Sequence, residues 1–149
     1  MYDRILVPTD GSPQAARALE HALDLARTYD AQLHVLFVVD ATAFASEVDA
    51  SLVTDELESY GERAVESAAE RASEAGIESV STAVLRGTPH REILDYAEGH
   101  DVDLVVLGTH GRRGLDRYLL GSVTERIVRT ADVPVLVVRS GDETAETTD

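Results

Sequence analysis

Residues 104–124 read LVVLGTHGRRGLDRYLLGSVT. The apolar run at the start shows no alternation, which is typical of a strand buried on both faces. The run breaks at Gly108, where we expect a sharp turn, and Gly111 follows in a basic loop with His110 and Arg112. Because glycine has no Cβ, it lets backbone N–H groups come close to an anion. The segment predicts a buried strand followed by an anion-contacting loop.

A helix is expected to begin directly after this loop. Ser122 and Glu125 have the S-x-x-E spacing of a capping box, so Gly121-Ser122 marks a helix N-terminus. The free N–H groups and the dipole of such a terminus favour phosphate. Taken alone, these features are more typical of the ordinary turns and caps of α/β proteins. Their combination between a strand and a helix favours a phosphate cradle.

Composition excludes several classes of protein. The 149 residues are enough for one domain. They include 28 acidic residues and 13 basic ones, and every one of the 13 basic residues is an arginine. Without lysine, the chain lacks the side chain that P-loop NTPases and protein kinases place on the phosphates and that Schiff-base enzymes use as their amine, so these three classes are excluded. A net charge of −15 also repels nucleic acids and anionic membranes, so neither is an expected partner. This acidity without lysine suggests a proteome adapted to high salt.

The location expected for the protein is the cytoplasm. Met1 is followed almost at once by a strand, with no pattern of a signal peptide. No apolar run approaches the roughly 20 residues of a membrane span. The absence of cysteine excludes disulfides, thiolate metal sites and a cysteine nucleophile.

The remaining sequence alternates between strand and helix patterns. Helices are expected at 13–29, 55–75, 89–99 and 122–131, and strands at 4–8, 33–39, 77–85, 102–107 and 133–138. Residues 40–53 show no clear periodicity and are interpreted as a loop with some helix. We expect one domain over residues 1–140, followed by a disordered acidic tail at 141–149.

This alternation predicts an α/β fold with an open five-stranded parallel sheet, Rossmann-like, with helices on both faces. With the strands numbered along the chain, the order 3-2-1-4-5 puts the topological switch between strands 1 and 4, where such folds bind ligands. Val133 to Val138 would then be an uncovered apolar edge. Such an edge invites pairing, so we expect a homodimer through antiparallel contact of this strand.

The pattern G-x2-G-x9-G-[ST] is complete at Gly108, Gly111, Gly121 and Ser122. It resembles the nucleotide-binding motif of the ATP-binding branch of the universal stress protein family. The similarity extends over residues 3–139 and includes the segments ILVPTDGS, FVVD and ADVPVLVV.

The resemblance implies that ATP binds at the switch point, with Mg²⁺ held through its phosphates. Asp10 would contact the adenosine together with its neighbours in the first turn, although it could equally shape that turn. Val38 would bound the adenine. The complete set of binding residues that the resemblance implies is Pro8, Thr9, Asp10, Val38, Gly108, His110, Gly111, Arg112, Gly121, Ser122, Val123 and Thr124.

The function expected from this resemblance is a stress-response protein that uses ATP as a regulatory ligand. Hydrolysis would be slow at most, because no residue of the cradle is an evident general base. Two alternatives stay open: the same fold binding AMP or cyclic AMP, and a protein-interaction module that works without nucleotide. An ATP pyrophosphatase or a receiver domain is not supported, because PTDGSPQ lacks a serine- and glycine-rich loop and the chain lacks lysine.

Overall fold

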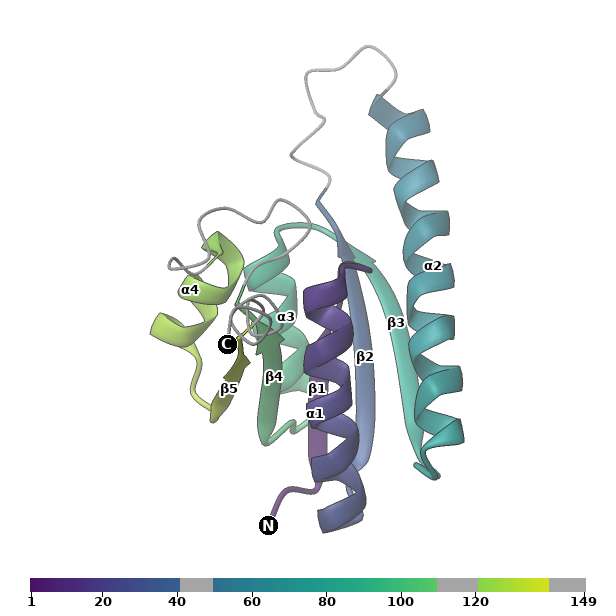
Figure 1. The fold of residues 1–149 in the computed structure, drawn as a ribbon. Helices are drawn as coiled ribbons and strands as arrows, with labels where there is room; N and C mark the ends of the chain where they lie inside the picture. Colours follow the sequence, from purple (N-terminus) through teal and green to yellow (C-terminus); the bar gives the residue numbers. More distant parts are fainter. Residues whose placement is uncertain (41–49, 110–120, 140–149) are drawn as a thin grey trace, which may run out of the picture.

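The structure is a computed structural model that describes residues 1–40, 50–109 and 121–139. Strands and helices alternate along these parts of the chain (Figure 1). In chain order they are β1 (Arg4–Pro8), α1 (Pro13–Tyr29), β2 (Gln32–Val39), α2 (Ala50–Glu74), β3 (Val80–Arg86), α3 (Pro89–Gly99), β4 (Leu104–Gly108), α4 (Ser122–Thr130) and β5 (Val135–Val138).

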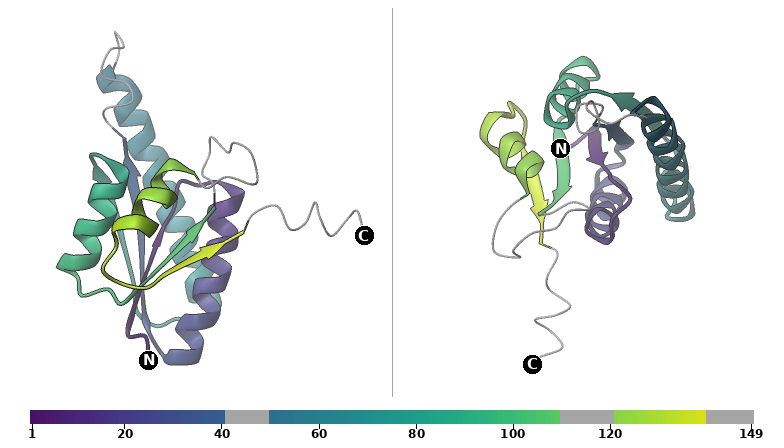
Figure 2. Two further views of the ribbon diagram at one scale, coloured as in Figure 1. Left: turned by 90° about the vertical axis from the view of Figure 1, so that its left-hand side faces the viewer. Right: turned by 90° about the horizontal axis from the view of Figure 1, so that it is seen from above.

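The five strands form one parallel sheet in the order β3-β2-β1-β4-β5, which confirms the predicted topology. Helices α1 and α2 cover one face of the sheet, and α3 and α4 cover the other (Figure 2). This division follows from right-handed crossovers, because the chain moves one way across the sheet up to β3 and the other way after it. The direction reverses between β1 and β4, so the carboxyl ends of these strands form the switch point.

Each face of the sheet has its own apolar layer. Successive residues of β1 alternate between the layers: Ile5 and Val7 pack under α1 and α2, while Leu6 packs under α3 and α4. All three side chains are fully buried, as are Val105 and Val106 of β4. Burial on both faces explains why these strands are apolar without alternation.

The first helix begins as its sequence predicts. Ser12 is the N-cap, its Oγ accepts a hydrogen bond of 3.2 Å from the Ala15 N–H, and Pro13 is the first helical residue. The start of α4 is different. Its N-cap is Gly121, Ser122 is already helical, and no side chain caps the helix, so the capping box expected from Ser122 and Glu125 was wrong.

Several other element boundaries differ from the expected ones, among them the starts of α2, β3 and β5. Helix α2 already begins at Ala50, inside the segment interpreted as a loop. Strand β3 begins at Val80, where pairing with Leu33 of β2 starts, so residues 77–79 lie before the strand. Strand β5 begins at Val135, because Pro134 has no N–H and contributes only its carbonyl, which accepts from the Val105 N–H at 3.0 Å.

The expected tail at 141–149 lies outside the described residues, as does most of the segment 40–53. Within the part of the chain that the structure describes, none of the helices has the length and apolar content required to span a bilayer.

Candidate functional site

The turn after β1 is held by short hydrogen bonds. The Thr9 N–H extends the sheet by donating to the Leu36 carbonyl at 2.8 Å, and the Thr9 hydroxyl oxygen accepts from the Gly11 N–H at 3.1 Å. One carboxylate oxygen of Asp10 accepts from the Ser12 N–H at 3.0 Å. Gly11 has φ of +80°, a left-handed conformation that residues with a Cβ rarely adopt. Asp10 therefore shapes this turn, which was one of its two interpretations.

The end of β4 lies directly against the start of α1. A Cβ at Gly108 would be only 3.0 Å from the backbone oxygen of Gln14. Gly108 is still part of the strand, paired in register with Val138, and it has no positive φ. The reason for this glycine is therefore close packing against the first turn of α1, and not the sharp turn expected from the sequence.

The start of α4 is fastened to the end of β4 by two hydrogen bonds. The Thr124 hydroxyl donates to the Gly108 carbonyl at 2.9 Å, and the Gly121 N–H donates to the Thr109 carbonyl at 2.6 Å. The Thr109 N–H in turn donates to Val138 of β5 at 3.1 Å. These bonds fix the N-terminus of α4 at the same edge of the sheet as the turn after β1.

No side chain caps this helix. Gly121 has an extended conformation with φ of −65° and ψ of 158°, and it offers no capping oxygen. The first bond within the helix runs from the Glu125 N–H to the Gly121 carbonyl at 2.9 Å, which leaves the N–H groups of Ser122, Val123 and Thr124 without helical partners. These three groups and the helix dipole provide donors for an anion.

Strand β2 also contributes to the candidate site, next to the turn after β1, the end of β4 and the start of α4. Leu36 is the register partner of Pro8, so β2 continues beyond the end of β1 and carries Val38 at the edge of the sheet. Val38 is half-buried and packs with the layer under α3 and α4. Val38 therefore places an apolar side chain at the carboxyl edge of the sheet, on the face covered by α3 and α4.

Nine of the twelve predicted site residues lie in the described part of the chain, at the carboxyl ends of β1, β2 and β4 and in the first turn of α4. The other three, His110, Gly111 and Arg112, lie outside the described residues.

Two residues of this region were not predicted. Thr109 is buried and links β4, β5 and α4 through its backbone. Tyr60 of α2 packs its ring against Gly11, where a Cβ would collide with the ring carbons. The only sequence signal for Thr109 is that it follows Gly108. The sequence gives no signal for Tyr60, because Tyr60 and Gly11 are about fifty positions apart and meet only in the folded chain.

The arrangement suits anion binding better than acid–base chemistry. The Asp10 carboxylate belongs to the turn after β1, where it accepts the hydrogen bond from Ser12. Among the described residues, no group of three histidine, aspartate or glutamate side chains is placed to hold a metal ion.

The strand order defines a doubly wound α/β protein. At the switch point of its sheet, the N-terminus of α4 has no side-chain cap. The sequence profile of the universal stress protein family matches residues 1–139, and the chain belongs to that family. A universal stress protein of Methanocaldococcus jannaschii is 39% identical over 142 residues, which cover 93% of this chain and 83% of that protein.

Solved structures show the same architecture. Universal stress protein UspA from Lactobacillus plantarum superposes with a TM-score of 0.85 at 31% identity, covering 93% of this chain and 98% of that one. A universal stress protein solved in complex with cAMP superposes with a TM-score of 0.70 at 25% identity, covering 93% and 97% of the two chains.

Proposed function

We propose that this protein is a cytoplasmic nucleotide-binding stress protein that uses ATP as a regulatory ligand. The observation that carries the proposal is the uncapped first turn of α4, held beside the turn after β1 by the bonds from Thr124 and Gly121. A phosphate placed there would receive the N–H groups of residues 122–124. The base would lie near Val38, and Pro8, Thr9 and Asp10 would contact the adenosine.

Mg²⁺ would be held on the phosphate oxygens, since this ion usually keeps several of its waters and binds through the phosphates of a substrate more than through a cage of protein ligands. The loop with His110, Gly111 and Arg112 would complete the cradle. Hydrolysis would be slow at most, because Asp10 is engaged by the Ser12 N–H and lies on the adenosine side.

The test removes a single N–H group from the helix. In Ser122→Pro, proline occupies the first helical position, where its fixed φ is favourable and its missing N–H breaks no helical bond. The ψ of 158° at Gly121 is also suitable before proline. Because a hydrogen bond to a charged group contributes about 1.5–3 kcal/mol, calorimetric titration with Mg-ATP should show a loss of about tenfold or more in affinity.

Ser122→Ala is the matched control, because it removes the hydroxyl and keeps the N–H. It should bind ATP within about twofold of the wild type if the backbone carries the phosphate contact. Gly111→Asp is a second test, because it brings a negative charge into the cradle. If folded wild-type protein binds no nucleotide, or if Ser122→Pro binds as tightly as Ser122→Ala, the proposal is wrong.

Another adenine nucleotide is the second candidate ligand. The relative in complex with cAMP favours it, since that chain shares the fold over nearly its whole length. The same titrations with AMP and cyclic AMP separate the candidates. Tighter binding of either one than of ATP would identify that nucleotide as the regulatory ligand. Failure of all three would leave the protein-interaction module as the remaining alternative.

The functional unit that we propose is a homodimer joined through β5, which lies at the edge of the sheet. In this strand, Leu136 is exposed and Val137 is half-buried. An antiparallel contact with a second copy would cover both side chains and pair the free backbone groups of the edge.

A further inference from the structure

A groove of about 490 Å³ lies between α1 and α2, on the face of the sheet opposite α3 and α4. Its volume is in the range of small-molecule sites. The floor is apolar and comes from Val7 of β1, Val35 of β2 and Leu19 of α1, all of them buried. None of the described residues that line the groove comes from α4, whose first turn, proposed above to hold the phosphates, belongs to the other face.

Small side chains keep the groove open. Ala15 and Ala16 line it from α1, and Ala64, Ser67 and Ala68 line it from α2. Both helices start at the carboxyl edge of the sheet and run in the same direction (Figure 1). Their facing stripes of small residues therefore leave a channel along the sheet, where larger side chains would have filled the space.

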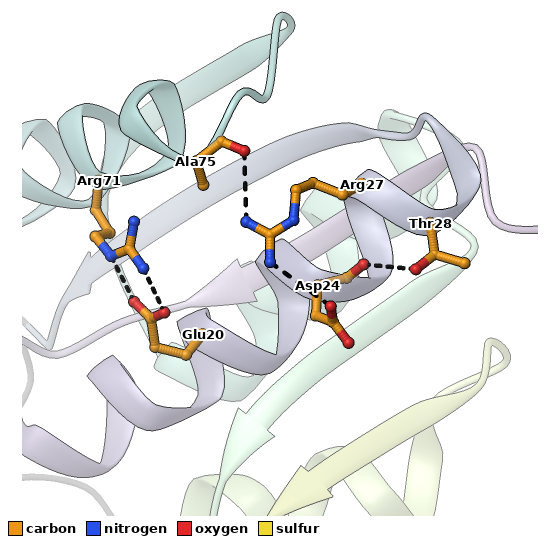
Figure 3. A network of polar contacts seen from close by, with 6 residues as sticks. All are labelled: Glu20, Asp24, Arg27, Thr28, Arg71 and Ala75. Carbon is orange, nitrogen blue, oxygen red and sulfur yellow. Dashed lines mark hydrogen bonds and ion pairs between the residues drawn. The ribbon is translucent and has the colours of Figure 1, made fainter.

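Both ends of the channel are defined by specific contacts. At the carboxyl edge, the Tyr60 ring lies between Gly11 and the Phe37 ring, with 5.9 Å between the two ring centroids. At the other end, Arg71 of α2 makes two hydrogen bonds of 2.8 and 2.7 Å to the Glu20 carboxylate of α1. Figure 3 shows this fork between the helices. The channel is thus preformed, and the charge of Arg71 is already neutralised.

A second contact between the helices lies beyond this fork. The Arg27 guanidinium of α1 donates to the Ala75 carbonyl at 3.4 Å and lies 3.6 Å from the Asp24 carboxylate (Figure 3). The spacing of α1 and α2 is therefore set at this end by two arginines. A ligand would find the two walls in place, and binding would cost little rearrangement.

The remaining charge on the groove belongs to Arg63. Within residues 1–40, 50–109 and 121–139, this guanidinium has no ion-pair or hydrogen-bond partner. Arg63 is exposed and lines the groove together with Ser67, which is also exposed and lies one helical turn further along α2. Arg63 thus places a cation at the rim of an apolar groove, which suits a ligand with one negative group and an apolar body.

We propose that the α1–α2 groove is a second ligand site, which takes a medium-chain fatty acid with its chain along the floor and its carboxylate on Arg63. The Ser67 hydroxyl donates a second hydrogen bond to the carboxylate. Thr9, Gly11 and Ser12 line the groove and also form the turn at the switch point. A fatty acid in the groove therefore touches the same turn as the proposed nucleotide, from the opposite face.

The test is calorimetric titration with decanoate, without nucleotide, at concentrations below micelle formation. The wild type should bind one decanoate per chain. Arg63→Gln keeps most of the side-chain length and removes the charge, so binding should weaken about fivefold, as expected for a partly exposed ion pair. Ala16→Leu fills the channel from an exposed position and should abolish binding.

Arg91→Gln on α3 is the matched control, because it removes an exposed arginine from the opposite face and should leave binding unchanged. Saturating Mg-ATP should not displace decanoate from the wild type. The proposal is overturned if folded wild type binds no decanoate, if Ala16→Leu binds normally, or if ATP competes for the same site. The first two outcomes do not depend on whether the nucleotide proposal is correct.

Discussion

Gly108 shows how one atom decides the packing at the switch point. A Cβ on Gly108 would be 3.0 Å from the carbonyl oxygen of Gln14 and 3.2 Å from its carbonyl carbon, and these backbone atoms cannot rotate away. Any larger residue would push the end of β4 from the start of α1. Because Thr124 is bonded to the Gly108 carbonyl, α4 would move as well.

We expect Gly108→Ala to lower the free energy of unfolding by about 1–3 kcal/mol, the usual cost of overpacking. Denaturant unfolding measures the effect, and nucleotide affinity should fall in the same variant. Gly99→Ala is the control, because no atom lies within 4 Å of a Cβ at Gly99. Equal stability of the two variants would contradict the packing argument.

His34 is a buried titratable residue in the middle of β2. Its Nδ1 lies 2.8 Å from the Tyr96 hydroxyl, and its Nε2 is buried without a hydrogen-bond partner among the described residues. Tyr96 stacks on His100, with the ring centroids 3.8 Å apart. Burial, followed by the charges of His100 and Arg4, lowers the pKa of His34 below the ordinary value of 6.5. The neutral imidazole is therefore the form that suits the fold.

This shift determines a pH dependence of stability. The unfolded chain binds a proton at His34 near pH 6.5, whereas the folded chain resists protonation until a lower pH. The free energy of unfolding should therefore fall as the pH drops below 6.5, until the folded form also takes up the proton. His34→Gln should flatten this part of the profile, as measured by denaturant unfolding between pH 8 and pH 5.

The exposed His21 provides the comparison for this experiment. His21→Gln should keep the acid-side slope of the wild type. A slope that survives in His34→Gln would show that other groups cause the loss of stability.

At the scale of elements, β5 is, with β3, one of the two edge strands of the sheet. Its partner on one side is β4, with Val105 paired to Val135 and Gly108 to Val138. Leu136 has 36% of its surface exposed, and its neighbours Val135 and Val137 are half-buried. An apolar edge strand of this kind is a site of pairing between chains.

We expect the wild type to sediment as a dimer at micromolar concentration and Leu136→Glu to sediment as a monomer, because the carboxylate would be buried in the interface. Leu52→Glu is the control, since Leu52 is also an exposed leucine but lies on α2 at the far edge of the sheet. A wild type that is monomeric, or a Leu136→Glu variant that stays dimeric, would exclude an interface through β5.

At the scale of the whole molecule, the dominant feature is the negative charge. Helix α2 carries glutamates at intervals of four residues, of which Glu62, Glu66, Glu70 and Glu74 are exposed, as expected for a solvated face. Glu58 instead binds Arg86 at 2.7 Å, next to a second bond from Arg86 to Asp55 at 3.0 Å. The exposed carboxylates repel one another along the helix and across the surface.

The free energy of unfolding should therefore rise with KCl, because 1 M salt shortens the screening length from about 10 Å at 0.1 M to about 3 Å. Denaturant unfolding at 0.1, 1 and 2 M KCl measures this effect, and we expect the largest gain in the first step. Full stability in dilute buffer would contradict adaptation to high salt.

The sequence by itself determined the elements of this protein, their order in the sheet and the edge at which a ligand would bind. Apolar strands and amphipathic helices are local patterns, and right-handed crossovers turn their alternation into one topology. For the same reason, the glycines and small polar residues that end β1 and β4 could be predicted from the sequence to lie at one edge of the sheet, where they form the candidate site.

Tertiary structure decided what depends on contacts between distant segments. The N-cap of α4 is Gly121 and not Ser122. Gly108 is required by the nearby backbone of Gln14, and the Tyr60 ring packs against Gly11. The groove between α1 and α2 was likewise invisible in the sequence, where its residues are ordinary alanines and arginines. A local pattern records which face of an element is buried, but the space left between two elements depends on how both of them pack on the sheet.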